Sequence, residues 1–162
     1  MIAAVGGTAV GAHLLRRIIE SHAIASRHID RLRTVVVTGP RIDPCALPDA
    51  PGVDKVGFVP DLHRRLAAAD LAVVQGGLTT TMELTAAKRP FIYFPLQNHF
   101  EQQIHVRHRL DRHHAGTPLD YHTATPDQIA HEMITALRQP VTYQSVPDDG
   151  ARRAATIIGR LL

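Results

Sequence analysis

The sequence predicts an α/β domain in which a parallel sheet carries helices on both faces. Short apolar runs alternate along the chain with segments whose apolar residues recur at helical spacing. One run, at residues 35–37, consists of three valines, which is typical of a strand buried on both faces of a sheet. With 162 residues and 44% hydrophobic content, the chain suits one domain, residues 1–162, with a full core.

Alternation of this kind produces parallel strand pairing. Strands are expected at residues 2–5, 33–38, 53–59, 71–74 and 91–94. Helices are expected around residues 14–20, 62–69, 80–88, 100–112, 126–138 and about 149–162. The start of the fifth helix is well marked, because Thr125 suits the N-cap, Pro126 the first helical position and Gln128 a capping box.

The composition argues against several classes of protein. No apolar run approaches the roughly 18–20 residues of a membrane span. A formal charge of +3 favours anionic partners such as nucleotide diphosphates or lipid headgroups. The basic residues are scattered and Trp is absent, so no nucleic-acid partner is expected. The single cysteine, Cys45, and the lack of a signal-peptide pattern lead us to expect a cytoplasmic protein.

Glycines follow the first expected strand, in the loop at residues 6–11, which reads Gly-Gly-Thr-Ala-Val-Gly. In α/β sheets ligands bind beyond the carboxyl ends of the strands. Glycines there allow close backbone approach, and a helix N-terminus offers free N–H groups to a phosphate. A tight turn that needs positive φ explains the same residues. The loop matches neither the P-loop pattern nor G-x-G-x-x-G.

A second loop, at residues 76–83, joins two glycines to a helix start with three threonines and Glu83. Exposed N–H groups and hydroxyls suit a diphosphate, and a carboxylate one turn inward would accept hydrogen bonds from both hydroxyls of a ribose. Thr80 and Glu83 also match a capping box, which needs no ligand. From these residues alone, capping is the favoured interpretation.

A third loop, at residues 95–103, contains amide and carboxylate side chains, including Gln97, that are suited to sugar hydroxyls. A solvated polar loop is the alternative interpretation. Eleven histidines raise the question of a metal, and His105 and His108 share a helix face. No further ligand has suitable spacing, so no metal site is expected. No pattern indicates a Ser or Cys nucleophile.

Together, the three loops resemble those of the C-terminal domain of GT-B glycosyltransferases, specifically glycosyltransferase family 28, the family of the UDP-GlcNAc transferase of lipid II synthesis. The resemblance covers nearly the whole chain and is most specific at residues 57–103. That stretch contains Gly-Phe-Val-Pro-Asp, Val-Gln-Gly-Gly-Leu-Thr, Met-Glu-Leu and Glu-Gln-Gln. It implies a Rossmann-like sheet forming the single C-terminal lobe of a GT-B fold.

The resemblance also implies a nucleotide-sugar donor site, with a UDP-sugar as the expected ligand. The backbone at Phe58 and Val59 would contact the base, and the two glycine loops would face the phosphates. Glu83 would bind the ribose and cap the helix at the same time. The glutamines would hold the donor sugar. The full expected set is Gly6, Gly7, Thr8, Phe58, Val59, Gly76, Gly77, Leu78, Thr79, Glu83, Gln97, Gln102 and Gln103. The family often places Asn-Ala where this chain has Val106-Arg107, at the sugar end of the site.

GT-B enzymes have two lobes, and this chain resembles only the second. We therefore expect a cut-out domain or a natural subunit that docks onto an N-terminal lobe. That partner would supply the acceptor site, the general base and any peripheral membrane association. Catalytic residues in this chain are unassigned, no cofactor is expected, and self-association through the interlobe face is a further expectation.

Two other functions are compatible with the same residues. A donor domain that has lost catalysis could act as a scaffold, which need not bind UDP or UDP-GlcNAc. A UDP-GlcNAc 2-epimerase relative shares the two-lobed architecture, but the motifs at residues 76–83 and 97–103 match the transferases better.

Overall fold

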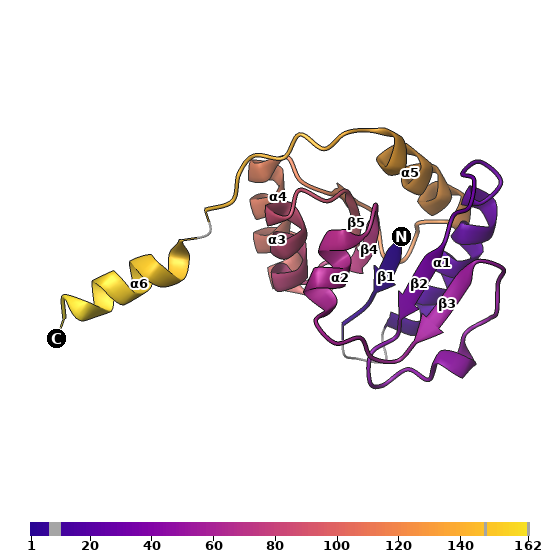
Figure 1. Cartoon of the computed structure of the whole chain (residues 1–162), viewed down its shortest axis with the longest axis horizontal. Coiled ribbons are helices and arrows are strands. Elements are labelled where there is room, and N and C mark those ends of the chain that lie inside the picture. The colour runs from indigo at the N-terminus through magenta and orange to yellow at the C-terminus, as the bar shows by residue number, and fades with distance from the viewer. Residues whose placement is uncertain (7–10, 148, 162) are drawn as a thin grey trace.

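The computed structural model describes residues 1–6, 11–147 and 149–161. Within these residues the chain forms one twisted sheet of six strands, flanked by helices (Figure 1). The strands are β1 (Ile2–Ala4), β2 (Thr34–Val37), β3 (Val53–Val56), β4 (Ala72–Gln75), β5 (Phe91–Phe94) and β6 (Thr117–Pro118). Every neighbouring pair is parallel, which confirms the predicted sheet.

The helices alternate with these strands, as the periodicity predicts. They are α1 (Ala12–Ala25), the short 3-10 helix η2 (Pro44–Ala46), α2 (Leu62–Ala68), α3 (Leu78–Ala86), the π-helical η3 (Glu101–Val106), α4 (Arg107–His113), α5 (Pro126–Arg138) and α6 (Gly150–Gly159). At the start of α5, the Thr125 side chain accepts from the Gln128 amide, and Gln128 Oε1 accepts from the Thr125 amide, so the predicted capping box is present.

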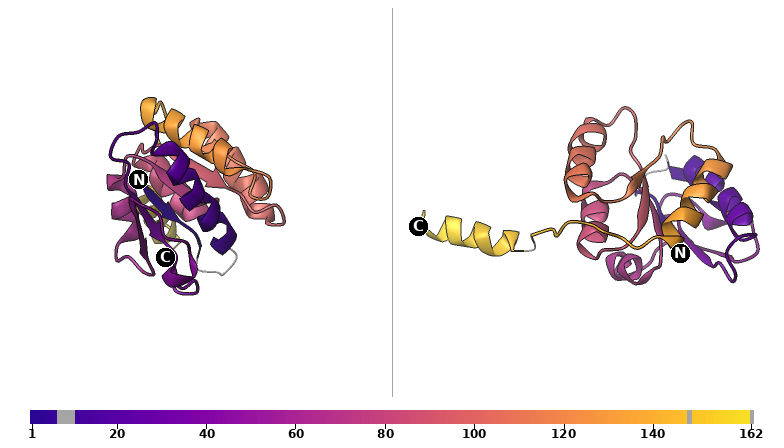
Figure 2. Two further views of the ribbon diagram at one scale, coloured as in Figure 1. Left: turned by 90° about the vertical axis from the view of Figure 1, so that its right-hand side faces the viewer. Right: turned by 90° about the horizontal axis from the view of Figure 1, so that it is seen from above.

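Helices α1 and α5 cover one face of the sheet, and α2, α3 and α4 cover the other (Figures 1 and 2). Successive strand residues point to opposite faces. Ala3, Val36 and Val73 therefore contribute to the core under α1 and α5. Ala4 and Val37 contribute to the core under the other three helices. Burial on both faces explains why the central strands are apolar except at their ends, where Thr34 begins β2 and Gln75 ends β4.

One buried histidine links α1 to the sheet. Nδ1 of His22 lies 2.7 Å from Oγ1 of Thr34, and its Nε2 lies 3.0 Å from the carbonyl oxygen of Pro51. The side chain is 1% exposed, so both polar contacts replace lost water. Burial lowers the pKa of His22, and the hydrogen bond to the Pro51 carbonyl opposes that effect.

The strand order is β3-β2-β1-β4-β5-β6. The chain runs from β1 outward to β3, returns to β4 beside β1, and then runs outward in the opposite direction. The strand order therefore reverses between β1 and β4. In open parallel sheets, the crevice outside the carboxyl ends of the strands at this point is where ligands bind.

The last helix, α6, projects away from the rest of the molecule (Figure 1). No residue of α6 is buried, and Ile157, Ile158 and Leu161 are exposed. The predicted final helix is thus present, but the packed part of the domain ends before it.

Candidate functional site

A hydrogen bond joins the two strand ends at the reversal point. The Gly6 amide donates to Oε1 of Gln75 across 3.0 Å. Gln75 ends β4 and is buried, whereas Gly6 is exposed. Gly7 and Thr8, the other residues predicted in this loop, lie outside the described residues.

Gly76 allows the β4–α3 loop to pack against the loop after β5. A Cβ at Gly76 would lie 2.9 Å from Cα of Pro95, closer than real side chains approach. The Gly76 amide also donates to the Phe94 carbonyl across 3.0 Å. A Cβ at Gly77, in contrast, would meet no atom of the described residues within 4 Å. The first glycine is therefore required by packing, and the second leaves open space before α3.

Helix α3 begins at Leu78 with Gly77 as its N-cap and no side-chain capping bond. The predicted capping box of Thr80 and Glu83 is wrong, because the helix starts two residues earlier and Thr80 already lies inside it. Among the described residues, no acceptor contacts the amide N–H of Leu78, Thr79 or Thr80. These groups and the helix dipole are available to an anion.

A hollow of about 390 Å³ opens beside this helix start. It brings together Phe58 and Val59, from the loop after β3, with Glu83 on α3, as predicted. The remaining lining residues are Asp61, Leu62, His63, Leu66 and Thr80. Phe58 is 76% exposed, so its ring is free to contact a ligand. Within the described part of the chain, the carboxylate of Glu83 has no hydrogen-bond or ion-pair partner.

The predicted glutamines hold the loop after β5 in place. Oε1 of the buried Gln102 accepts from the Leu96 amide across 2.9 Å. Nε2 of Gln103 donates to the Pro95 carbonyl across 3.2 Å. Because Pro95 also packs on Gly76, the three predicted loops form one continuous rim from Gly6 to Gln103. None of the glutamines lines the hollow beside α3.

Gln97 has a partner that the sequence analysis missed. Its Nε2 donates to Oδ2 of Asp120 across 3.0 Å. This bond, with those from the Thr123 and His122 amides, holds the pKa of the Asp120 carboxyl well below its usual range. Asp120 and the nearby Thr123 are residue types typical of turns, so the sequence indicates a turn at this position. It does not indicate the contact between Asp120 and Gln97, which depends on the fold.

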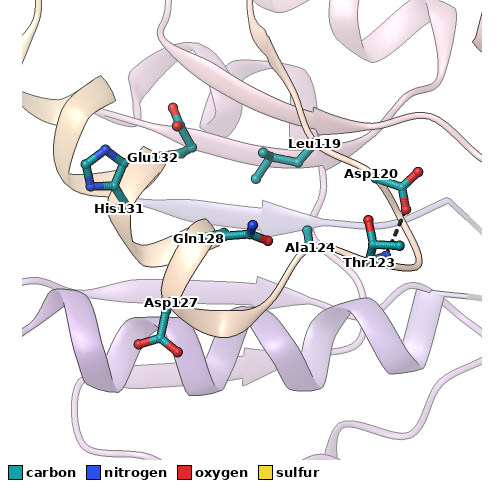
Figure 3. A pocket seen from close by; sticks show the side chains of 8 residues that line it. All are labelled: Leu119, Asp120, Thr123, Ala124, Asp127, Gln128, His131 and Glu132. Atoms are coloured by element: carbon teal, nitrogen blue, oxygen red, sulfur yellow. Dashed lines mark hydrogen bonds between the residues drawn. The ribbon is translucent and has the colours of Figure 1, made fainter.

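A second hollow, of about 470 Å³, lies beside Asp120 at the start of α5 (Figure 3). Asp120, Asp127 and Glu132 contribute three carboxylates to its lining, with His131 as the one basic group. Both hollows contain carboxylates, but at the start of α5 the Thr125 side chain already caps the Gln128 amide, whereas helix α3 begins without a side-chain cap. The open helix start makes the hollow beside α3 the better candidate for an anionic ligand.

The described residues contain no group of three or more His, Cys, Asp or Glu placed to hold a metal ion. Among the helices that the structure describes, none has the length and apolarity to cross a bilayer.

Comparisons with known proteins show the family and the fold of the chain. Residues 1–159 match the glycosyltransferase family 28 C-terminal domain. An uncharacterized glycosyltransferase of Methanopyrus kandleri is 27% identical over 97% of this chain and 44% of its own length. A UDP-N-acetylglucosamine–N-acetylmuramyl-(pentapeptide) pyrophosphoryl-undecaprenol N-acetylglucosamine transferase of Corynebacterium glutamicum is 31% identical over 69% of this chain and 33% of its own. The chain thus spans less than half of either relative.

Solved structures share the fold. Acinetobacter baumannii MurG superposes with a TM-score of 0.68 at 19% identity, covering 98% of this chain and 49% of MurG. Spinosyn rhamnosyltransferase SpnG, solved with thymidine diphosphate, gives a TM-score of 0.62 at 18% identity over 98% of this chain and 40% of SpnG. The architecture is that of the C-terminal lobe of GT-B glycosyltransferases, and the chain belongs to the glycosyltransferase family 28 C-terminal domain family.

Proposed function

We propose that this chain is the donor half of an inverting glycosyltransferase and binds a nucleotide-diphosphate sugar. A sugar nucleotide like UDP-GlcNAc is the expected donor. The observation that carries the proposal is the hollow in which Phe58, Val59 and Glu83 lie together beside the open start of α3. Phe58 and Val59 come from the loop after β3 and Glu83 comes from helix α3, and the sequence predicts a donor-binding role for each.

The nucleoside occupies this hollow. The backbone at Phe58 and Val59 contacts the base, and the exposed Phe58 ring adds apolar contact. The unpaired carboxylate of Glu83 accepts hydrogen bonds from the two ribose hydroxyls. Charge-assisted bonds of this kind are stronger than neutral ones, which suits a residue that selects ribose.

The diphosphate lies at the start of α3, where the space above Gly77 is open. The free amides of Leu78, Thr79 and Thr80 donate to its oxygens. Gly6 lies beside the end of β4, where its amide is anchored to Gln75, and this position supports a phosphate contact in the first glycine loop. Contacts of Gly7 and Thr8 with the phosphates stay a prediction. Gly76 contributes indirectly, since its contact with Pro95 sets the position of the helix start.

The donor sugar lies toward the loop after β5. Gln97 and Gln103 each use the amide nitrogen for a bond within the protein, which leaves their Oε1 atoms to accept from sugar hydroxyls. Gln102 acts by holding the Leu96 amide in position. Asp120 orients Gln97.

The identity of the nucleotide is indicated by a relative of the chain and by Glu83. The C. glutamicum relative is named for UDP-N-acetylglucosamine and is 31% identical. SpnG was solved with thymidine diphosphate but is only 18% identical. The nearer relative and the free carboxylate of Glu83, which suits a ribose with both hydroxyls, favour UDP.

In the reaction, an acceptor hydroxyl attacks the anomeric carbon while the bond from that carbon to the diphosphate oxygen breaks. The leaving oxygen gains negative charge, which the α3 amides and dipole stabilise. The acceptor proton passes to a general base on an N-terminal lobe, from the same polypeptide or a partner subunit. That lobe also carries the acceptor site and any membrane association. A cytoplasmic setting suits the exposed free thiol of Cys45.

Calorimetric titration of UDP and UDP-GlcNAc into the 162-residue chain tests the proposal. We expect saturable binding of both ligands and no transfer of the sugar to any acceptor. Absence of binding to either ligand would favour a scaffold instead. Transfer at an enzyme-like rate by this chain alone would contradict the need for a second lobe.

A further inference from the structure

We propose that a separate hollow, between α3 and α4, binds the phosphate group of an anionic ligand. This basic hollow is lined by Met82, His105, His108, Arg109, Arg112 and His113, and its volume is about 350 Å³. It shares no lining residue with the hollow beside the start of α3, so the inference does not depend on the proposed donor site.

Four of these residues form one stripe. His105, His108, Arg109 and Arg112 follow the i, i+3, i+4, i+7 spacing of a helix face. The opposite stripe, which includes Val106 and Leu110, is buried in the core. The face that α4 turns away from the sheet therefore carries basic side chains at each of these positions.

The lining contains no carboxylate. Glu101 and Asp111 lie on the same helical segment and are exposed, but neither lines the hollow. Within the described part of the chain, no carboxylate lies within ion-pair distance of Arg109 or Arg112. The positive charge in the hollow is thus not neutralised by the described residues.

The basic side chains at the end of α4 interact favourably with the helix dipole, but this explains only some of the basic residues in the hollow. Cations in the last turn of a helix are stabilised by its C-terminal carbonyls, which accounts for Arg112 and His113. His105 and His108 lie one or more turns earlier, beyond the reach of that effect. Their convergence with Arg109 on one concave surface needs another reason.

His113 lines the hollow with only part of its ring. Its Nδ1 atom is buried and has no hydrogen-bond partner among the described residues, so the ring contributes to the hollow through its other atoms.

The side chains select the ligand class. Guanidinium groups bind phosphate oxygens through paired N–H donors, and imidazoles add further donors. The hollow is large enough for a phosphate or diphosphate, and the Met82 side chain gives it one apolar wall. Such a group could belong to a soluble phosphate compound or to an anionic lipid headgroup.

The test uses the full chain and its histidine ring signals in NMR. Inorganic pyrophosphate is added at constant pH and ionic strength. We expect saturable shifts of the His105, His108 and His113 ring signals, with His28 and His131 unmoved. Local reporters are needed because pyrophosphate is also expected at the start of α3. If all histidines shift in parallel, the site does not exist.

Two double variants distinguish binding in the basic hollow from attraction by the overall positive charge of the chain. R109Q combined with R112Q should weaken binding about tenfold or more, since two charge-assisted contacts are lost. R27Q combined with R152Q removes the same charge from exposed positions elsewhere and should leave binding unchanged. Equal affinity in the two double variants would overturn the proposal.

Vesicle co-sedimentation identifies the source of the phosphate. Phosphatidylcholine vesicles with and without phosphatidylglycerol are compared for the wild type and both double variants. Sedimentation with phosphatidylglycerol that is lost in the R109Q, R112Q variant indicates a lipid headgroup. Pyrophosphate binding without sedimentation indicates a soluble ligand. Failure of both probes to bind contradicts the inference.

Discussion

The Gly6 amide and the Gln75 side chain are 3.0 Å apart and join the ends of β1 and β4, 69 residues apart in sequence. This bond lies where the strand order reverses, which is the position at which parallel sheets bind their ligands. Gln75 is therefore the link between the first glycine loop and the rest of the candidate site.

Replacing Gln75 with Leu should release the backbone at Gly6. The Gly6 amide loses its acceptor, so we expect a loss of about 1 kcal/mol in the free energy of unfolding, together with weaker UDP binding. Urea denaturation and calorimetry measure the two effects. Gln139→Leu, at an exposed position after α5, is the control and should stay within about 0.5 kcal/mol. Equal stability of the two variants would count against the link.

The adjacent glycines of the second loop form a matched pair. A Cβ at Gly76 would meet Pro95 at 2.9 Å, so Gly76→Ala should destabilise the fold by about 1–3 kcal/mol. The added methyl of Gly77→Ala meets none of the described atoms within 4 Å, so this variant should fold with near-native stability. Its methyl group enters the space assigned to the diphosphate, so UDP binding should fall several-fold. Thermal melts and UDP titration of both variants check this split, and native UDP affinity in Gly77→Ala would contradict it.

The buried His22 predicts a loss of stability in acid. Burial lowers its pKa in the folded state, so the unfolded chain takes up a proton more readily. The contribution of neutral His22 to the free energy of unfolding is complete above about pH 6.5, the ordinary pKa of histidine. It is lost as the pH falls toward the lower pKa of the folded state. Its slope is at most about 1.4 kcal/mol per pH unit.

The contribution of His22 is separated from that of the other histidines by measuring urea midpoints across this pH range. The wild type is compared with His22→Gln. The wild type should lose stability more steeply than the variant below about pH 6.5. Parallel pH profiles would show that His22 does not titrate with unfolding.

Much of the fold followed from local pattern. The apolar runs and helical spacing predicted five strands and the helix order, because burial on both faces leaves a clear signal. Strand β6 was missed, since Thr117–Pro118 is only two residues long and contains a proline, which lacks the N–H of a ladder. The π-helical turn of η3 has no comparable signal in sequence.

The start of α3 shows why local motifs fail. Thr80 and Glu83 match a capping box, yet the helix begins at Leu78. Leu78 and Met82, one turn apart, both pack against the core beneath α3, so tertiary packing favours the earlier start. The same limit applies to Asp120, whose contact with Gln97 spans 23 residues and depends on the fold alone.

The central claim is tested most directly by comparing UDP with thymidine diphosphate in the wild type and Glu83→Gln. UDP has both ribose hydroxyls, and the deoxyribose of thymidine diphosphate lacks one. Glu132→Gln, in the acidic hollow of Figure 3, is the control. We expect the wild type and control to prefer UDP by about tenfold, and Glu83→Gln to lose most of that preference. Unchanged UDP affinity in Glu83→Gln would contradict the proposed donor site.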